Sequence, residues 1–587
     1  MTASRRNSWR LRIDVTGFLP VACIGLIGWA ALAGSAAAQV GEPAQLLPRV
    51  TPDYGAAPPA AAPDSGGAVD PAAPQGFEID TLDAVGVGYA GTLEPGNGGL
   101  GFDMWRGTDR AKLERLLPLL KPPTSPVLAE LTRRLLLSSA AAPAGRGGGR
   151  NLLPVRAEIL GNMGLVEDAI ALLRLVPADQ RDPETARLLT ELSWRAGDVD
   201  GGCAVVQDAM PRVPVDEFWQ QASVFCQLRA GQTDAAMLGL DLLREQGEGD
   251  EVFYALADAL GGASPVEIPP LTVVSPLYLA MARAAGLPVP RVAIHEPPPL
   301  MLALIAEDPD APIESRLAAA ETAAAAGVLS PQHLAASYTA EPADPGTLDK
   351  ALDLPDLGAT PATRAVLYQA ALRAEAAEQR ARLLQKALAA DVLDPNYWAR
   401  LKLYLPLLAD IPAAPELSWF AADAARHLFA GGRRHAASEW VALLQGDEDA
   451  PKLVALEYLA GEDGATPDVE ALLPADPSRA ARLRALFAAV EEPAEPSIGG
   501  LESSSLAAVA APVLPRQNVN LWLDLGDAAA KNRVGETVLL TLVGLDATGL
   551  AAADPQWLGR GVASLRRIGL AEDARRLAVE AAIVNGL

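Results

Sequence analysis

The sequence predicts an all-α protein, an α-solenoid of helical hairpins that follows an N-terminal export signal and an Ala/Pro-rich linker. Three observations support this fold class. Apolar residues recur at spacings of three and four from Thr108 almost to the C-terminus. No stretch shows the alternation typical of a strand, and a short glycine phrase returns at nearly constant intervals. The chain of 587 residues is too long for one compact bundle, so many short helices in series indicate repeats.

The N-terminus has the order of features found in secretory signal peptides. Four arginines between residues 5 and 12 precede an apolar run over residues 18–32, and Ala36-Ala37-Ala38 supplies small residues for cleavage before Gln39. This run is shorter than the roughly 20 residues that a membrane-spanning helix needs. An uncleaved anchor is the alternative, and Ser4-Arg5-Arg6 also resembles a twin-arginine signal. We therefore expect a periplasmic or secreted protein.

The charge balance is strongly acidic. The chain carries 48 Lys+Arg and 73 Asp+Glu, a net charge of -25, and loss of residues 1–38 removes four Arg and one Asp, which makes it -28. Such a surface repels phosphate backbones, so it excludes nucleic acid as a general partner and disfavours docking on anionic lipid. No later stretch is apolar enough to cross a membrane, and we expect no span after signal cleavage.

Composition divides the remaining chain into segments. Residues 39–80, rich in Ala and Pro, bury too little apolar surface to fold and are expected to form a disordered tether. Residues 261–300 contain nine prolines and leave room for one short helix, about Leu277 to Ala285. We interpret them as a hinge or as a strip packed along the solenoid. The full division is 1–38 signal peptide, 39–80 tether, 81–107 Gly-rich N-terminal cap, 108–260 helical repeats, 261–300 Pro-rich hinge, 301–490 helical repeats, 491–517 linker and 518–587 C-terminal hairpins.

A repeated phrase marks the turns of the hairpins. Gly164-Leu165-Val166-Glu167-Asp168-Ala169 recurs at Gly197 and Gly231, with glycines 33 and 34 residues apart. Each glycine follows one helical pattern and precedes another, as expected for a glycine that ends the first helix of a hairpin. A small residue five positions later allows the two helices to approach closely. The glycine and small-residue pairs are Gly164 and Ala169, Gly197 and Gly202, Gly231 and Ala236, Gly432 and Ala437, and Gly569 and Ala574.

This pattern resembles the tetratricopeptide repeat family, whose unit is about 34 residues long and whose turn carries a glycine with an alanine five residues later. The resemblance is clearest over residues 151–245, and Pro214 lies where the family often closes a unit. Leu153, Ala186 and Gln220 occupy the place of the usual first-helix aromatic residue, so the repeat is degenerate. The resemblance implies a superhelix with an extended surface that grips a peptide, a helix or another protein.

Two cysteines remain after signal cleavage, Cys203 and Cys226. Cys203 should lie early in the second helix of one hairpin, and Cys226 late in the first helix of the next. Neighbouring helices of a solenoid pack together, so we expect a disulfide, which is favoured in an exported protein. Two buried free thiols are the alternative.

Motifs that carry chemistry are weak or out of context. The pattern from Gly86 to Gly91 matches a dinucleotide-binding loop, but Thr92 to Gly99 cannot begin the helix that this site requires. Glu314-Ser315 and Glu502-Ser503 lack the second motif of lytic transglycosylases. The histidines lack metal-ligand spacing, and they are His295, His333, His427 and His435. We expect no catalytic residues, no cofactor and no metal.

The predicted function is therefore a non-enzymatic envelope scaffold or assembly factor that binds an unidentified protein partner through the solenoid surface. A structural subunit of an envelope secretion, polysaccharide-export or motility complex is the first alternative. An enzyme whose site is assembled from scattered carboxylates is the second. Fold alone does not choose among them.

Overall fold

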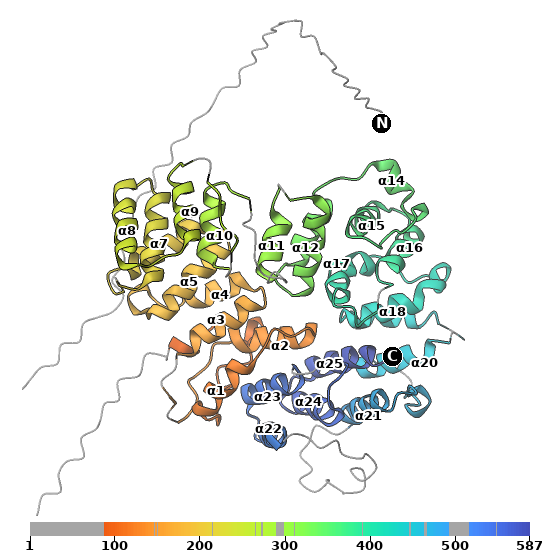
Figure 1. Cartoon of the computed structure of the whole chain (residues 1–587). Coiled ribbons are helices and arrows are strands. Elements are labelled where there is room, and N and C mark those ends of the chain that lie inside the picture. Colours follow the sequence, from red (N-terminus) through yellow and green to blue (C-terminus); the bar gives the residue numbers. More distant parts are fainter. Residues whose placement is uncertain are drawn as a thin grey trace, which may run out of the picture. The chain divides into compact units, whose positions relative to one another are not determined.

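A computed structural model describes most of the chain as α-helices packed on their neighbours, which confirms the predicted all-α, solenoid-like fold (Figure 1). Within the described residues there are 25 α-helices and no strand, only two isolated bridges. The described residues are 87–145, 147–148, 151–213, 215–263, 266–271, 274–288, 299–309, 311–389, 391–444, 446, 448–462, 466–491, 516–546 and 549–587.

The helices fall in chain order as follows. The first ten are α1 Arg110–Leu116, α2 Pro126–Leu137, α3 Leu152–Asn162, α4 Val166–Arg174, α5 Pro183–Arg195, α6 Val199–Ala209, α7 Glu217–Arg229, α8 Thr233–Gln246, α9 Glu251–Leu260 and α10 Pro276–Ala284. The next eight are α11 Pro299–Glu307, α12 Ile313–Ala325, α13 Pro331–Thr339, α14 Pro345–Asp349, α15 Pro361–Arg373, α16 Ala377–Ala387, α17 Tyr397–Ala409 and α18 Ala421–Ala430. The last seven are α19 Arg434–Val441, α20 Ala450–Ala460, α21 Pro477–Glu491, α22 Arg516–Ala530, α23 Val534–Asp546, α24 Pro555–Arg567 and α25 Ala571–Val584.

The repeated glycines form the turns of five hairpins, α3–α4, α5–α6, α7–α8, α18–α19 and α24–α25. All five have left-handed φ values, and in each turn the N–H of the following residue donates to a carbonyl five residues earlier, as Leu165 does to Leu160 at 2.9 Å. This is the Schellman arrangement, which favours glycine because it lacks Cβ. The φ values are 78° at Gly164, 82° at Gly197, 70° at Gly231, 70° at Gly432 and 88° at Gly569.

The small residues five positions after these glycines are buried between the two helices of each hairpin. Ala169, Ala236, Ala437 and Ala574 are fully buried. A Cβ atom on Gly202 would lie 2.4 Å from the indole Nε1 of Trp194, so even alanine is too large there without a shift. Close helix approach is thus the physical reason for this part of the repeat.

Aspartates begin the first helices of three successive hairpins. Asp182, Asp216 and Asp250 are the N-caps of α5, α7 and α9, and each side chain accepts a hydrogen bond from a backbone N–H in the first turn. Their numbers differ by 34 and 34, the period of the repeat. The caps therefore place the starts of these helices in register along the solenoid.

Buried apolar side chains form two hydrophobic clusters. One belongs to α5–α10 and part of α11, with Trp219, Phe225, Phe253 and Met281 at or near full burial. The other joins α1–α4, with Leu189 and Leu192 of α5 and Ala306 of α11, to the helices from α12 to α25. The predicted segment boundaries remain a prediction. The two hydrophobic clusters divide the helices differently from that predicted division, because α1–α4 share their core with the C-terminal helices.

The C-terminal helices pack against the beginning of the helical region. Helix α25 contacts α2 as well as α18, α20 and α21, and α23 contacts α1 and α2 (Figure 1). Arg134 of α2 forms an ion pair with Asp573 of α25 at 2.7 Å, and Lys112 of α1 forms one with Glu536 of α23 at 2.6 Å. The last helices of the chain therefore contact the first ones, a long-range contact that the repeat pattern did not predict.

The N-terminal cap is fastened to the end of α2 and to residues 139–141 by backbone hydrogen bonds, and to α3 by one buried arginine. Arg156 of α3 donates to the carbonyls of Leu136, Gly88 and Ala90, so it joins the C-terminus of α2 to the cap. Burial lowers the pKa of this guanidinium to about 10, which leaves it charged at neutral pH. Its positive charge is well placed beside the C-terminal carbonyls of α2.

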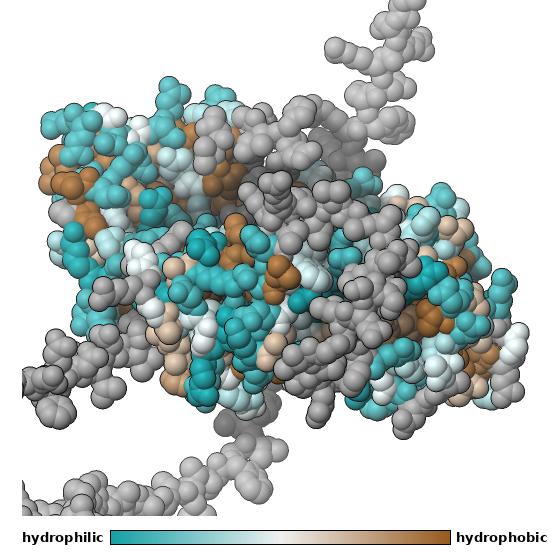
Figure 2. Space-filling model, turned by 90° about the horizontal axis from the view of Figure 1, so that it is seen from below, coloured by the Kyte–Doolittle hydropathy of each residue, from teal (hydrophilic) through white to brown (hydrophobic). Residues whose placement is uncertain are grey.

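Parts of the predicted organisation lie outside the described residues. They are the signal peptide over 1–38, the tether over 39–80 and most of the linker over 491–517. No helix in the described part of the chain is both long and apolar enough to cross a membrane. Hydrophilic side chains cover most of the coloured surface in Figure 2, and apolar side chains reach it in separate patches.

Candidate functional site

The candidate site lies on the first-helix face, which we define as the surface formed by α5, α7 and α9. Helix α10 packs against all three of these helices. Leu277 and Met281 are its fully buried anchors, at 1% and 0% exposure. The described part of the Pro-rich segment therefore carries the short helix expected from the sequence, displaced by one residue, and this helix packs across successive repeat units.

An open groove of about 370 Å³ remains on this face beside the N-terminus of α10. Its apolar walls come from Phe218, Val252, Leu271 and Leu277. Its polar lining residues are Arg187 of α5, Asp216, Glu217 and Gln221 of the α7 start, Asp250 at the α9 start, and Ser275 and Tyr278 beside and in α10. The groove thus combines an apolar wall with acidic groups from two adjacent repeat units.

The three carboxylates of the groove have hydrogen-bond donors but no basic partner within 4.0 Å in the described structure. The backbone N–H of Trp219 donates to Asp216 Oδ1 at 3.4 Å, and that of Phe253 donates to Asp250 Oδ1 at 2.8 Å. Glu217 Oε1 accepts from Gln221 Nε2 at 2.8 Å and from the N–H of Gly249 at 3.1 Å. The carboxylates are thereby held in position while their charges stay uncompensated by a cation.

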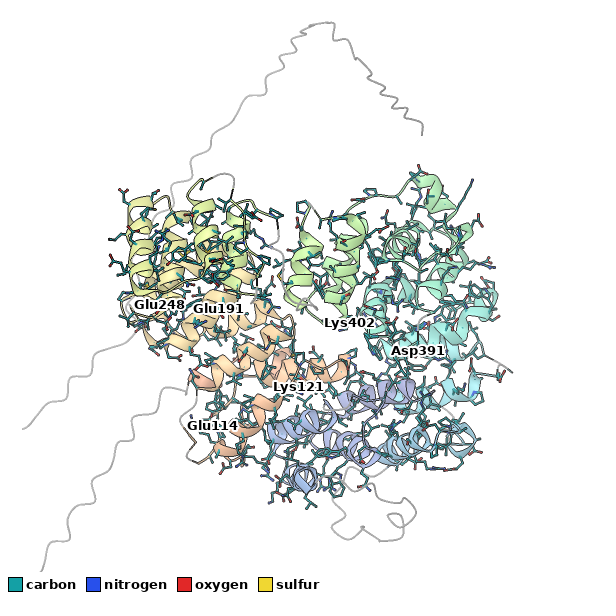
Figure 3. All side chains as sticks on the ribbon, viewed as in Figure 1. Glu114, Lys121, Glu191, Glu248, Asp391 and Lys402 are labelled. Atoms are coloured by element: carbon teal, nitrogen blue, oxygen red, sulfur yellow. A yellow bond between two sulfur atoms is a disulfide. The ribbon has the colours of Figure 1, made fainter. Side chains whose placement is uncertain are left out.

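The only arginine among the lining residues is already engaged. Arg187 Nε donates to Glu191 at 3.0 Å, and its guanidinium lies 4.3 Å from the centroid of the Phe218 ring. Glu191 and Glu248 are labelled in Figure 3, where both lie in the group of helices α5 to α9. Because Glu191 offsets the charge of Arg187, the groove keeps the negative charge of its three carboxylates.

Two neighbouring groups respond to this negative charge. A hydrogen bond and repulsion from Glu217 raise the pKa of Glu248. The pKa of the Tyr278 phenol is raised by burial and also by its hydrogen bond and proximity to Asp250. The shift at Glu248 reflects the negative charge of Glu217, which disfavours a further anion there, whereas the shift at Tyr278 is first of all an effect of burial.

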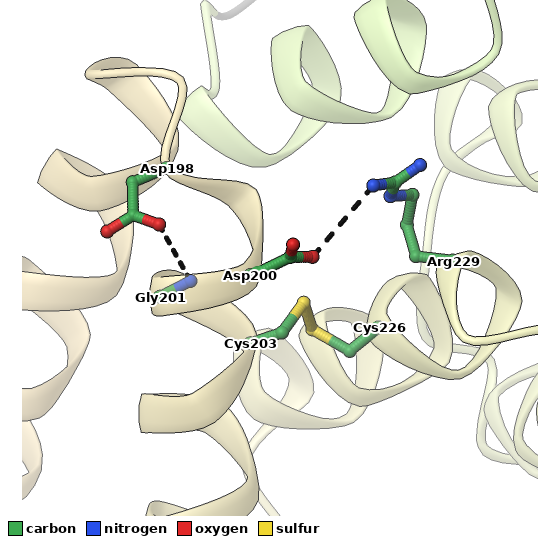
Figure 4. Close-up of a disulfide and its surroundings, with 6 residues drawn as sticks. All are labelled: Asp198, Asp200, Gly201, Cys203, Cys226 and Arg229. Carbon is green, nitrogen blue, oxygen red and sulfur yellow. Dashed lines mark hydrogen bonds and ion pairs between the residues drawn. A yellow bond between two sulfur atoms is a disulfide. The ribbon is translucent and has the colours of Figure 1, made fainter. Parts of the chain in front are cut away.

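The disulfide lies in the same cluster of helices. The structure joins Cys203 of α6 to Cys226 of α7, with their Cα atoms 5.5 Å apart (Figure 4). Asp200 and Arg229 form an ion pair across the same two helices at 3.9 Å. The covalent link fixes the α5–α6 hairpin to the α7–α8 hairpin, and α7 belongs to the first-helix face.

The other motifs considered in the sequence do not assemble into a site. Among the described residues, the first α-helix after Gly88 and Gly91 begins only at Arg110, and the carbonyl of Gly88 accepts a hydrogen bond from Arg156. His427 is buried and hydrogen-bonds to the Tyr397 hydroxyl, and burial lowers its pKa to about 4. His435 is exposed beside Glu462, and Glu314 lies in the first turn of α12. His295 and Glu502 lie outside the described residues.

The sequence analysis did not predict the acidic groove, although the sequence contained a signal for two of its three carboxylates. Asp216 and Asp250 belong to the 34-residue series of N-caps, so a search for capping residues at the repeat period would have found them. The wall residues Leu271, Ser275, Leu277 and Tyr278 could not be found in this way, since their position depends on where α10 docks.

In the described part of the chain, no group of three or more His, Cys, Asp or Glu side chains is placed to hold a metal ion. Comparison of the chain with protein-family models, curated proteins and solved structures gave no match.

Proposed function

We propose that this chain is an exported, non-catalytic scaffold that holds a segment of a partner protein in the groove of the first-helix face. In this proposal the α3–α9 region is a degenerate tetratricopeptide-like repeat, and the partner lies in the periplasm or at the cell envelope. A disulfide that joins two repeat units suits an oxidising compartment, which supports export.

One observation carries the proposal. The first-helix face already holds a helical segment, α10, across three repeat units, and it leaves an open groove next to it. A surface that accommodates one segment of its own chain has the width and the apolar character needed for a second segment supplied by another protein.

The test compares protein capture by two matched tryptophan variants. Ser275→Trp fills the groove, and Ser275 makes no side-chain capping hydrogen bond that the substitution would remove. Ser478→Trp adds the same side chain at an exposed position at the start of α21, outside the groove. Tagged chains are captured from the native cell envelope after mild cross-linking, and bound proteins are identified by mass spectrometry.

We expect one or two proteins at constant ratio to the wild-type chain and to Ser478→Trp, and their loss with Ser275→Trp. Equal recovery with both variants would contradict binding in the groove. A partner at fixed stoichiometry that remains bound to Ser275→Trp would instead support the alternative of a structural subunit in an envelope complex.

A further inference from the structure

We propose that the groove selects a basic partner segment, and that Asp216, Glu217 and Asp250 receive its arginine or lysine side chains. This inference rests on the proposed function and adds the chemical class of the ligand. It is drawn from the charge that the groove leaves uncompensated and from the distribution of that charge along the groove.

A balance of charges decides between an anionic and a cationic ligand. The N-termini of α7 and α9 both open at the groove, and each contributes about +0.5 elementary charge, which by itself would favour an anion. Three carboxylates outweigh them, because Arg187 is paired with Glu191. The groove therefore carries about two net negative charges, and an anionic ligand would be repelled.

The distribution of the carboxylates favours a polypeptide over a single metal ion. Asp216 and Glu217 come from the start of α7, and Asp250 comes from the start of the next first helix, α9. Among the described residues these side chains do not converge into a metal-binding group. Acidic groups spread over two repeat units instead match cationic side chains spaced along a chain.

The apolar wall completes the match to a basic side chain. Arginine and lysine carry long aliphatic stems that pack on apolar surface while the charged end stays with its acidic partner. Phe218, which is half-buried, offers this surface next to the carboxylates, and the buried side chains of Val252 and Leu277 complete the wall. The guanidinium of Arg187 already lies 4.3 Å from the centroid of the Phe218 ring, so the face of this ring accepts a cationic group.

The test measures binding of short fluorescein-labelled peptides to the full chain by fluorescence anisotropy. The probe is a peptide of arginine–leucine–alanine repeats, and matched peptides carry lysine, citrulline or glutamate in place of arginine. We expect binding of the arginine and lysine peptides that weakens as salt is added, and about tenfold or weaker binding of the citrulline and glutamate peptides.

The matching protein variant removes the charges while it keeps the caps. Asp216→Asn, Glu217→Gln and Asp250→Asn are combined, since asparagine is as good an N-cap as aspartate. Asp554→Asn, at the N-cap of α24, is the control outside the groove. We expect about tenfold weaker binding of the arginine peptide by the triple variant and unchanged binding by Asp554→Asn.

Equal binding of arginine and citrulline peptides, no binding of any peptide at about 1 mM, or an unaffected triple variant would overturn the inference. Circular dichroism checks that each variant is folded. These outcomes are separable from the proposed function. A partner that is lost with Ser275→Trp but retained by the triple variant would support groove binding and contradict selection for basic segments.

Discussion

The carboxylate of Glu580, in the last helix, accepts a hydrogen bond at 3.2 Å from the backbone N–H of Val127, in the first turn of α2 and 453 residues earlier. Glu580 also accepts a hydrogen bond from the side chain of Ser125, the N-cap of α2, and is 3% exposed. The C-terminal helix thus supplies a carboxyl oxygen that caps the N-terminus of a helix near the start of the described chain. This contact is the clearest single link in the closure of the helical region.

Glu580 makes closure sensitive to pH. Burial raises its pKa to about 7, although the hydrogen bonds and the charges of Arg576 and Lys402 lower it in part. Between the pKa of an exposed glutamate and about 7, the folded chain binds one more proton than the unfolded chain. The free energy of unfolding therefore falls as pH rises through this window, by about 3 kcal/mol in total.

We predict that Glu580→Gln raises the free energy of unfolding by about 2 to 3 kcal/mol at pH 8 and changes it little at pH 4. Urea unfolding at a series of pH values measures the difference. Glu536→Gln is the matched control, because Glu536 is equally buried but paired with Lys112. It should lower stability at pH 8 by about 2 kcal/mol. A loss of stability with Glu580→Gln at pH 8 would contradict the assigned pKa shift.

We predict that the mature, unreduced protein contains no free thiol and that reduction lowers its stability. The Cys203–Cys226 bond closes a loop with a sequence separation of 23, which should stabilise the fold by about 3 kcal/mol. Alkylation of the unfolded, unreduced protein followed by mass spectrometry counts the thiols, and thermal unfolding of Cys203→Ala/Cys226→Ala gives the loss. Detection of two alkylated cysteines in the unreduced sample would rule the bond out.

We predict that Gly569→Ala destabilises the α24–α25 hairpin by about 1 kcal/mol. The cause is backbone conformation alone, since φ is 88° and a Cβ at this position meets no atom within 4 Å. Gly569→Asn should cost less, because Asn532 already adopts φ of 51° in the turn between α22 and α23. Urea unfolding compares the two variants. Equal losses for alanine and asparagine would point to a contact rather than to the left-handed turn.

We predict that Arg156→Lys detaches the N-terminal cap. One ammonium group cannot replace the guanidinium bonds to Leu136, Gly88 and Ala90, so the variant should lose about 3 kcal/mol. Hydrogen exchange provides a local readout, because the N–H of Ala140 donates to the Tyr89 carbonyl. Its exchange should accelerate in Arg156→Lys and stay unchanged in Arg187→Lys, an exposed control. Unaltered protection in both variants would refute the role of Arg156.

The sequence was informative where structure depends on local rules. The glycines Gly197 and Gly231 indicated two hairpin turns, because a helix commonly ends at a residue with left-handed backbone conformation and glycine favours that conformation. The spacing of Cys203 and Cys226 placed both residues on adjacent helices for the same reason. Contacts between distant segments could not be read in this way. The docking of α10 on α5 and the cap that Glu580 gives to α2 depend on tertiary packing, which no repeat period encodes.

The most direct test of the central claim is site-specific photo-cross-linking in the native cell envelope. A photoreactive amino acid is placed at Ser275, which lines the groove, or at Ser478, which lies outside it. The account predicts a discrete adduct with one partner protein at Ser275, absent at Ser478, whose cross-linked segment is rich in arginine or lysine. No adduct at Ser275, or the same adducts at both positions, would contradict the claim that this groove binds a partner.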